Sequence, residues 1–294
     1  MRLVLHIGAH GTDDGRIAGW IARNRGALEA AGIAAPPPRQ FLARISEALD
    51  RERDADPLAR EEALMRGLGA SGQRLRMVVS APGLLGPASD VIASEGFYVR
   101  DVARRLYGMG TLFPRTRLTI LLAVRQASGV VPSILPDEPG AADALLPLVA
   151  DETLPWSRLA ATIRHQLPRA SVIVWRHEDL ARVWPGVLGE VVGPAAALPP
   201  AGLMDFAAEG LNAEARLRMS RYLAGAGKAP QSAGQLRQTA EVFARRYGVS
   251  VPHDPAGALP GWVRVRLSQL DAGYATEWGD LASLDGVRVL MPPP

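Results

Sequence analysis

The sequence predicts a three-layer α/β fold, in which a mostly parallel central sheet carries helices on both faces. Short apolar segments of strand length alternate along the chain with longer segments whose apolar residues recur at helical spacing. The first apolar segment, 2–7, leads directly into a glycine-rich turn and a helix. The segment 117–124 is a continuous apolar run with β-branched members, which is typical of a buried parallel strand. Strands that alternate with helices favour a parallel sheet covered on both faces.

The elements follow one another without an internal repeat or a long linker, so a single domain, 1–294, is predicted. Strands are expected at 2–7, 74–80, 117–124, 171–175 and 287–290. Helices are expected between Gly15 and Gly32, twice within 39–69, and at about 88–106, 156–167, 179–190, 212–224, 232–246 and 262–283, which makes the C-terminal half rich in helix. The stretch 132–155 is rich in Pro, Asp and Ala and is expected to be irregular, in the manner of a lid.

Composition narrows the classes of function. Of 294 residues, 48% are hydrophobic and 21% are charged, which is typical of a soluble globular protein, and no apolar run is long enough to predict a transmembrane segment. The net charge is only +3 and arginines alternate with acids, as in 50–54, so a nucleic-acid partner is not expected. The absence of Cys excludes disulfides and thiolate chemistry. The N-terminus lacks the features of a secretory signal, and we expect a cytoplasmic protein.

The turn after the first strand is a candidate anion-binding loop. It contains Gly8, His10, Gly11, Thr12, Asp13, Asp14 and Gly15, and it leads into a helix that begins near Arg16. A helix N-terminus offers unpaired backbone N–H groups to a phosphate. The turn is not a Walker A loop, because it has no lysine. Asp13 or Asp14 could instead cap the helix through the same N–H groups, and this interpretation is favoured for the turn taken alone.

A second candidate lies at the end of the strand 117–124. Arg125 follows this strand directly and Ser133 comes eight residues later. An arginine at the carboxyl edge of a sheet can hold a phosphate through its planar fork of N–H groups, and a serine hydroxyl can add a further donor.

Taken together, these segments resemble the sulfotransferase family, which implies a P-loop-like sulfotransferase fold. LHIGAHGT (5–12) and NRGALEAAGI (24–33) are similar to the family's opening strand, nucleotide loop and first helix. LLAVRQASGVVPSIL (121–135) resembles its second nucleotide motif, in which an Arg and a Ser eight apart bind the 3′-phosphate of the donor 3′-phosphoadenosine 5′-phosphosulfate. VIVWRHEDL (172–180) and DAGYATEWGDLASLDGVRVL (271–290) resemble later segments. The resemblance implies binding of that donor, or of its product 3′-phosphoadenosine 5′-phosphate, through the first loop, Arg125 and Ser133.

The first loop departs from the family pattern. His10 and Thr12 match the family's loop of the form His-Lys-Thr-Gly-Thr-Thr. Gly11 stands in place of the lysine that contacts the 5′-phosphosulfate, and the positions for Gly, Thr and Thr hold Asp13, Asp14 and Gly15. A carboxylate near an anion repels it by about 4 kcal/mol at 4 Å and an effective dielectric of about 20. Loss of the lysine and gain of two acids therefore predict impaired sulfuryl transfer.

Two features could compensate for the altered loop, and one catalytic candidate remains. Arg16 could supply the missing cation, although a solvated helix residue is the simpler interpretation, and Asp13 and Asp14 could bind a bridging divalent cation. His10 is the candidate general base, with a loop-ordering hydrogen bond as its alternative role. Ser80 follows a strand where related proteins place a carboxylate, and none is present here. The remaining histidines show no metal-ligand spacing, so no metal site is predicted.

Three hypotheses follow. The first is a sulfotransferase-like protein that binds the phosphoadenosine nucleotide but transfers sulfate poorly or not at all. The second is an active sulfotransferase that modifies a hydroxyl of a glycan or small molecule. The third is a non-catalytic scaffold whose cleft is closed by the capping aspartates.

Overall fold

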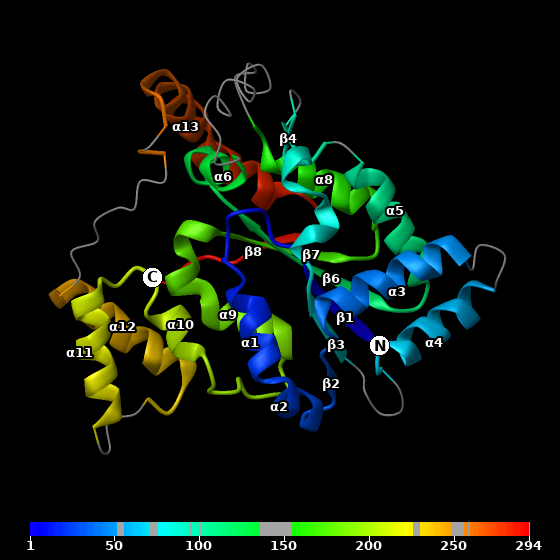
Figure 1. The fold of residues 1–294 in the computed structure, drawn as a ribbon, viewed down its shortest axis with the longest axis horizontal. Helices are drawn as coiled ribbons and strands as arrows, with labels where there is room; N and C mark the ends of the chain where they lie inside the picture. The colour runs from blue at the N-terminus through cyan, green and yellow to red at the C-terminus, as the bar shows by residue number, and fades with distance from the viewer. Residues whose placement is uncertain are drawn as a thin grey trace.

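The protein is built on one parallel sheet, as predicted. The computed structural model describes residues 1–51, 56–70, 76–93, 96–99, 101–135, 154–225, 230–247, 256–257 and 259–293. Six strands pair in the order β2-β3-β1-β6-β7-β8, and every pairing among them is parallel (Figure 1). The strands are β1 (Arg2–His6), β2 (Ile33–Ala34), β3 (Arg76–Ser80), β6 (Arg117–Val124), β7 (Ser171–Arg176) and β8 (Val287–Val289).

Strand alternation divides the apolar side chains between two cores. Successive side chains of a strand point to opposite faces, so Leu3 and Leu5 of β1 join one buried cluster and Val4 joins the other. Helices cover both faces, which gives three layers (Figure 1). The face that holds Val4 is covered by α1 (Arg16–Arg23), α2 (Arg25–Ala30), α9 (Leu180–Val192), α10 (Leu203–Ala207), α11 (Ala213–Ala224) and α12 (Ala233–Tyr247).

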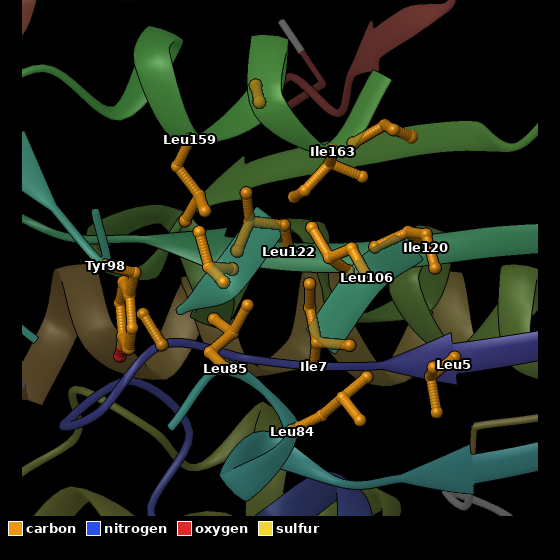
Figure 2. Close-up of a cluster of buried hydrophobic side chains, with 14 of the residues drawn as sticks. Leu5, Ile7, Leu84, Leu85, Tyr98, Leu106, Ile120, Leu122, Leu159 and Ile163 are labelled. Atoms are coloured by element: carbon orange, nitrogen blue, oxygen red, sulfur yellow. The ribbon is translucent and has the colours of Figure 1, made fainter. Parts of the chain in front are cut away.

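The opposite face holds the larger core. Figure 2 shows Leu5, Ile7, Ile120 and Leu122 of the sheet side packed against Leu159 and Ile163. This face is covered by α3 (Pro38–Arg51), α4 (Pro57–Gly67), α5 (Val102–Leu112), α6 (Ala127–Ile134), α8 (Trp156–Gln166) and α13 (Gly261–Ser283). Among the described residues, no helix combines the length and apolarity needed to cross a membrane.

The strand order places a topological switch point between β1 and β6. β1 pairs with β3 on one side and with β6 on the other, so the connections that leave β1 and β6 diverge. Ligands of open α/β sheets bind at such a topological switch point. The loop 7–15, Arg125 and His177 each follow a strand at this edge of the sheet.

Some elements differ from the sequence-based prediction. The helix expected at 88–106 is wrong: this region holds two short 3₁₀ turns, the antiparallel pair β4 (Ile92–Ala93) and β5 (Gly96–Phe97), and only then α5. Gly96 and Tyr98 have φ of +134° and +54°, which an α-helix cannot contain. The two-residue β2 and the short α10 were not expected from periodicity.

Two further segments qualify the prediction. The first helix is divided at Asn24, whose side-chain amide donates to the carbonyl of Trp20 (2.8 Å) and so competes with the continuing helix. The irregular stretch expected at 132–155 begins within α6, which continues to Ile134. The part 136–153 lies outside the described residues.

Candidate anion site at the carboxyl edge of the sheet

The loop after β1 caps its own helix. The Asp13 carboxylate accepts the backbone N–H of Ile17 (2.8 Å) and that of Gly15 (3.4 Å). Its side chain is only 6% exposed, so the negative charge lies at the N-terminus of α1, where the helix dipole stabilises it. The interpretation of Asp13 as a cap is confirmed. The N–H groups that a phosphate would need at this helix end are taken by a carboxylate of the protein itself.

Thr12 stabilises the loop through hydrogen bonds to the backbone of Ala9. Its buried hydroxyl donates to the carbonyl of Ala9 (2.7 Å) and accepts the backbone N–H of the same residue (3.3 Å). These bonds close a tight turn between strand and helix, so the hydroxyl is not directed at a ligand in this conformation.

Gly11, Arg125 and Ser133 meet at the centre of the site. The Arg125 guanidinium donates through Nη1 to the carbonyl of Gly11. A Cβ atom added at Gly11 would lie 2.1 Å from Ser133 Oγ and 2.5 Å from Ser133 Cβ. The loop therefore lies directly against Arg125 and Ser133, as the resemblance of these motifs to the sulfotransferase family requires. Gly11 also has φ of +70°, so this position has neither the space nor the backbone conformation for a lysine.

Arg125 is positioned by the first turns of α6. A Cβ at Gly129 would lie 2.2 Å from Arg125 Nε, so the absence of a side chain there lets the guanidinium lie along the helix. Ser133 Oγ donates to the carbonyl of Val130 (2.6 Å), one turn earlier. Arg125 and Ser133 thus project from one rigid element toward the loop.

His10 orders the loop through Tyr98. The Tyr98 hydroxyl accepts the His10 backbone N–H (2.8 Å) and lies 2.8 Å from His10 Nδ1. Tyr98 is buried, and its ring extends from the larger core toward this loop (Figure 2). The hydroxyl and Nδ1 share one hydrogen bond, so this ring nitrogen is engaged within the loop. Burial lowers the pKa of His10 and so favours the neutral ring. The loop-ordering interpretation is favoured over a general base.

Arg16 is paired with two acids. Its guanidinium forms an ion pair with Glu209, which follows α10, and another with Asp14 (3.1 Å). Burial raises the pKa of Glu209, and the Arg16 charge opposes that shift. The Asp14 side chain is 69% exposed, so the two aspartates of the loop face different environments. Within the described part of the chain, no group of three or more potential metal-ligating side chains is found.

His177 completes the charged cluster. It follows β7, and burial together with the positive charges of Arg125 and Arg16 lowers its pKa to about 4. Its Nδ1 is buried and has no hydrogen-bond partner among the described residues. The neighbouring Glu178 links the start of α6 to α13. Its carboxylate accepts the backbone N–H of Gln126 (3.0 Å) and the hydroxyl of Tyr274 (3.1 Å).

A Ser–His pair lies beneath the loop. His6 and Ser80 face each other on neighbouring strands, and His6 Nδ1 is 2.8 Å from Ser80 Oγ. Both side chains are buried, and the His6 ring stacks on Trp175 with centroids 5.8 Å apart. The pair therefore supports the floor of the loop, and burial lowers the pKa of His6.

The site includes residues that the sequence motifs did not indicate. Tyr98 and Glu209 come from segments with no recognisable pattern. Gly129 lies within the motif 121–135 and His177 within 172–180, but neither was assigned a role. A His directly after a strand of the sheet was the one available signal, because the carboxyl ends of parallel strands converge. Comparison with protein-family models, curated proteins and solved structures gives no significant match.

Proposed function

We propose that this protein binds a phosphoadenosine nucleotide, such as 3′-phosphoadenosine 5′-phosphate, in the cleft between the loop 7–15 and α6, and that it does not transfer sulfuryl groups. The observation that carries the proposal is the convergence of Gly11, Arg125 and Ser133. Arg125 is half-buried and its partner in the loop is a neutral carbonyl, which an anionic phosphate oxygen can replace with a stronger, charge-assisted hydrogen bond.

The same geometry argues against transfer. The loop lacks the cation at Gly11, and Asp13 already uses the helix N-terminus. Arg16, the one residue that could replace the missing charge, is paired with Glu209 and Asp14. Since electrostatic stabilisation of the leaving phosphate is worth about 3–4 kcal/mol per donor, a loop with none aimed at it is expected to be inactive.

Calorimetry with 3′-phosphoadenosine 5′-phosphate tests the proposal. We expect saturable binding that Arg125→Ala weakens about tenfold or more, because a hydrogen bond to a charged group is worth about 1.5–3 kcal/mol. Arg104→Ala, which removes a surface arginine whose side chain is 75% exposed, is the matched control and is expected to change nothing. Adenosine 5′-monophosphate, which lacks the 3′-phosphate, is expected to be insensitive to Arg125→Ala.

A scaffold function is the second candidate, and one observation favours it. Arg125, Arg16 and the N-terminus of α1 all have partners within the protein, so the cleft is closed without a ligand. Failure of the bisphosphate to bind at millimolar concentration, or binding that survives Arg125→Ala, would reject the nucleotide site and leave the scaffold. Transfer of labelled sulfate from the donor to any hydroxyl acceptor would reject the non-catalytic assignment.

A further inference from the structure

A second cavity lies beside the anion site and has a different chemistry. It runs along α13 between α6 and α8 and has a volume of about 370 Å³, which is in the range of small-molecule sites. Its walls are mostly apolar and aromatic, with Arg125 at the side shared with the anion site and two acids on the helix. The residues that the argument uses are Phe97, Trp156, Gly273, Glu277 and Asp280. Neither the acids nor the aromatic wall has a role in the nucleotide site.

The aromatic wall is preformed. The rings of Phe97 and Trp156 stack with their centroids 3.9 Å apart, and Trp156 Nε1 donates to the carbonyl of Arg125 (2.9 Å). The two rings are only 3% and 1% exposed, so the part of them that borders the cavity is a fixed apolar surface. Such a surface can pack against the apolar body of a ligand.

The acidic side of the cavity is on α13. Glu277 Oε1 accepts the backbone N–H of Ser157 at the start of α8 (2.7 Å), which holds the carboxylate at the cavity wall. Asp280 lies one turn further along the same helix and lines the same cavity. Burial raises the pKa of Glu277 to about 7, and the negative charge of Asp280 adds to this increase. A carboxylate in this position gains from a cation that enters the cavity.

Glycine keeps the cavity open. Gly273 lies within α13 and lines the cavity, and a Cβ added there would meet nothing within 4 Å. A glycine inside a helix lowers the stability of the helix. At Gly273 the missing side chain leaves open space beside the backbone, and this space is part of the cavity. Gly279 lies in the same helix and also has open space around its Cβ, but it does not line the cavity.

We propose that the cavity along α13 binds an organic ammonium ion, whose apolar body lies against Phe97 and Trp156 and whose charged nitrogen reaches the carboxylates of Glu277 and Asp280. The site takes a primary or secondary amine that carries an aromatic or branched apolar group. It borders the nucleotide site and shares Arg125 with it, but the groups proposed to bind the amine are the acids on α13.

Phenethylamine is the probe, and phenethyl alcohol and hydrocinnamate are its neutral and anionic counterparts of similar shape. Binding is measured by ligand-observed NMR and calorimetry on the full chain. We expect the amine to bind at least about tenfold more tightly than the alcohol, and hydrocinnamate not to bind. Glu277→Gln keeps an acceptor for the Ser157 N–H and is expected to remove the preference for the amine while the alcohol binds as before.

Two helix variants locate the site. Gly273→Leu is expected to abolish binding of the amine by filling the cavity, whereas Gly279→Leu, which makes the same change on another side of α13, is expected to leave it intact. Cooperative thermal unfolding of both variants confirms that they fold, and if Gly273→Leu does not fold, the amine-to-alcohol ratio in Glu277→Gln decides. Equal affinity for amine and alcohol, no amine binding at millimolar concentration, or unchanged binding in Gly273→Leu would overturn the proposal. Binding of the bisphosphate is expected to be unchanged in Glu277→Gln, so the two sites can fail separately.

Discussion

Gly11 and Gly15 share a left-handed backbone but differ in their surroundings. Their φ angles are +70° and +74°, and a Cβ at Gly15 would meet nothing within 4 Å, whereas one at Gly11 would overlap Ser133. We expect Gly15→Ala to cost about 1–2 kcal/mol, the cost of the left-handed conformation for a residue with a side chain. Gly11→Ala is expected to cost clearly more and to weaken bisphosphate binding. Urea denaturation of the two variants measures the difference.

Ser133→Gly supplies the control for this comparison. In a Gly11→Ala/Ser133→Gly double variant the overlap is removed and only the backbone cost remains, so the stability is expected to approach that of Gly15→Ala plus the cost of Ser133→Gly alone. Equal costs for Gly11→Ala and Gly15→Ala would show that the loop does not pack against Ser133.

Asp13 stabilises α1 at the expense of anion binding. Asp13→Ala removes the cap and is expected to lower the free energy of unfolding by about 1 kcal/mol. Asp13→Asn keeps the acceptor oxygen but removes the charge, so it is expected to preserve most of that stability and to tighten bisphosphate binding. Asp14→Asn removes an equal charge from a carboxylate that is 69% exposed, and its effect on both quantities is expected to be smaller. Unfolding and calorimetry on the three variants test this ranking, which a stronger effect of Asp14→Asn would contradict.

At the residue scale, the features predicted correctly from sequence are those that depend only on neighbouring residues in the chain. A short acid before a helix predicts a cap, and an Arg directly after the strongest strand predicts a side chain at the sheet edge; Asp13 and Arg125 occupy these places. Tyr98 and Glu209 could not be predicted, because they reach the loop from 88 and 193 residues away in the chain, respectively, counted from His10 and Arg16. Such contacts depend on tertiary packing and leave no periodic signal.

At the scale of elements, two ion pairs join α1 to the region of α10. Arg16 pairs with Glu209 through side chains that are 25% and 18% exposed, and Arg23 pairs with Asp205 through side chains that are 49% and 43% exposed. Exposed pairs contribute about 0.2–1 kcal/mol, whereas breaking a fully buried pair costs about 3–5 kcal/mol. Double-mutant cycles to Ala are expected to give a larger coupling for Arg16–Glu209 than for Arg23–Asp205. Equal couplings would show that solvent reaches both pairs alike.

The incorrect helix at 88–106 shows where periodicity fails between elements. Apolar residues there recur at intervals compatible with a helix, but Gly96 and Tyr98 adopt positive φ and β4 pairs with β5 in antiparallel fashion. Tyr98, directly after β5, is hydrogen-bonded to His10. The strands of the sheet were predicted well because a buried parallel strand is an uninterrupted apolar run, which needs no partner to be recognised.

At the scale of the whole molecule, two buried groups give stability opposite dependences on pH. The pKa of His177 is lowered to about 4 in the folded chain, so its contribution is present above its unfolded value of 6.5 and is lost as the pH falls. The pKa of Glu277 is raised to about 7, so the protonated form is favoured by folding and stability is lost as the pH rises above the unfolded value of 4.5. The two windows overlap and their slopes oppose each other.

A variant that lacks one of these groups should show only the pH dependence of the free energy of unfolding that the other group causes. Between pH 4.5 and 6.5, Glu277→Gln is expected to make the free energy of unfolding rise more steeply with pH than in the parent chain, and His177→Asn is expected to make it fall, each by up to about 1.4 kcal/mol per pH unit. Urea denaturation at several pH values measures both slopes. A variant whose slope equals that of the parent chain would mean that the group it removes is solvated in the folded protein.

The position of α13 and β8 has a consequence for synthesis of the chain. α13 buries Val263, Leu267, Leu270, Tyr274, Trp278 and Leu281 against a core whose other members are all made earlier, and β8 then pairs with β7. A nascent polypeptide that has emerged only through α12 therefore displays uncovered apolar surface on α6 and α8, which chaperones and proteases recognise. Folding of this face of the sheet is therefore completed only after α13 has been synthesised.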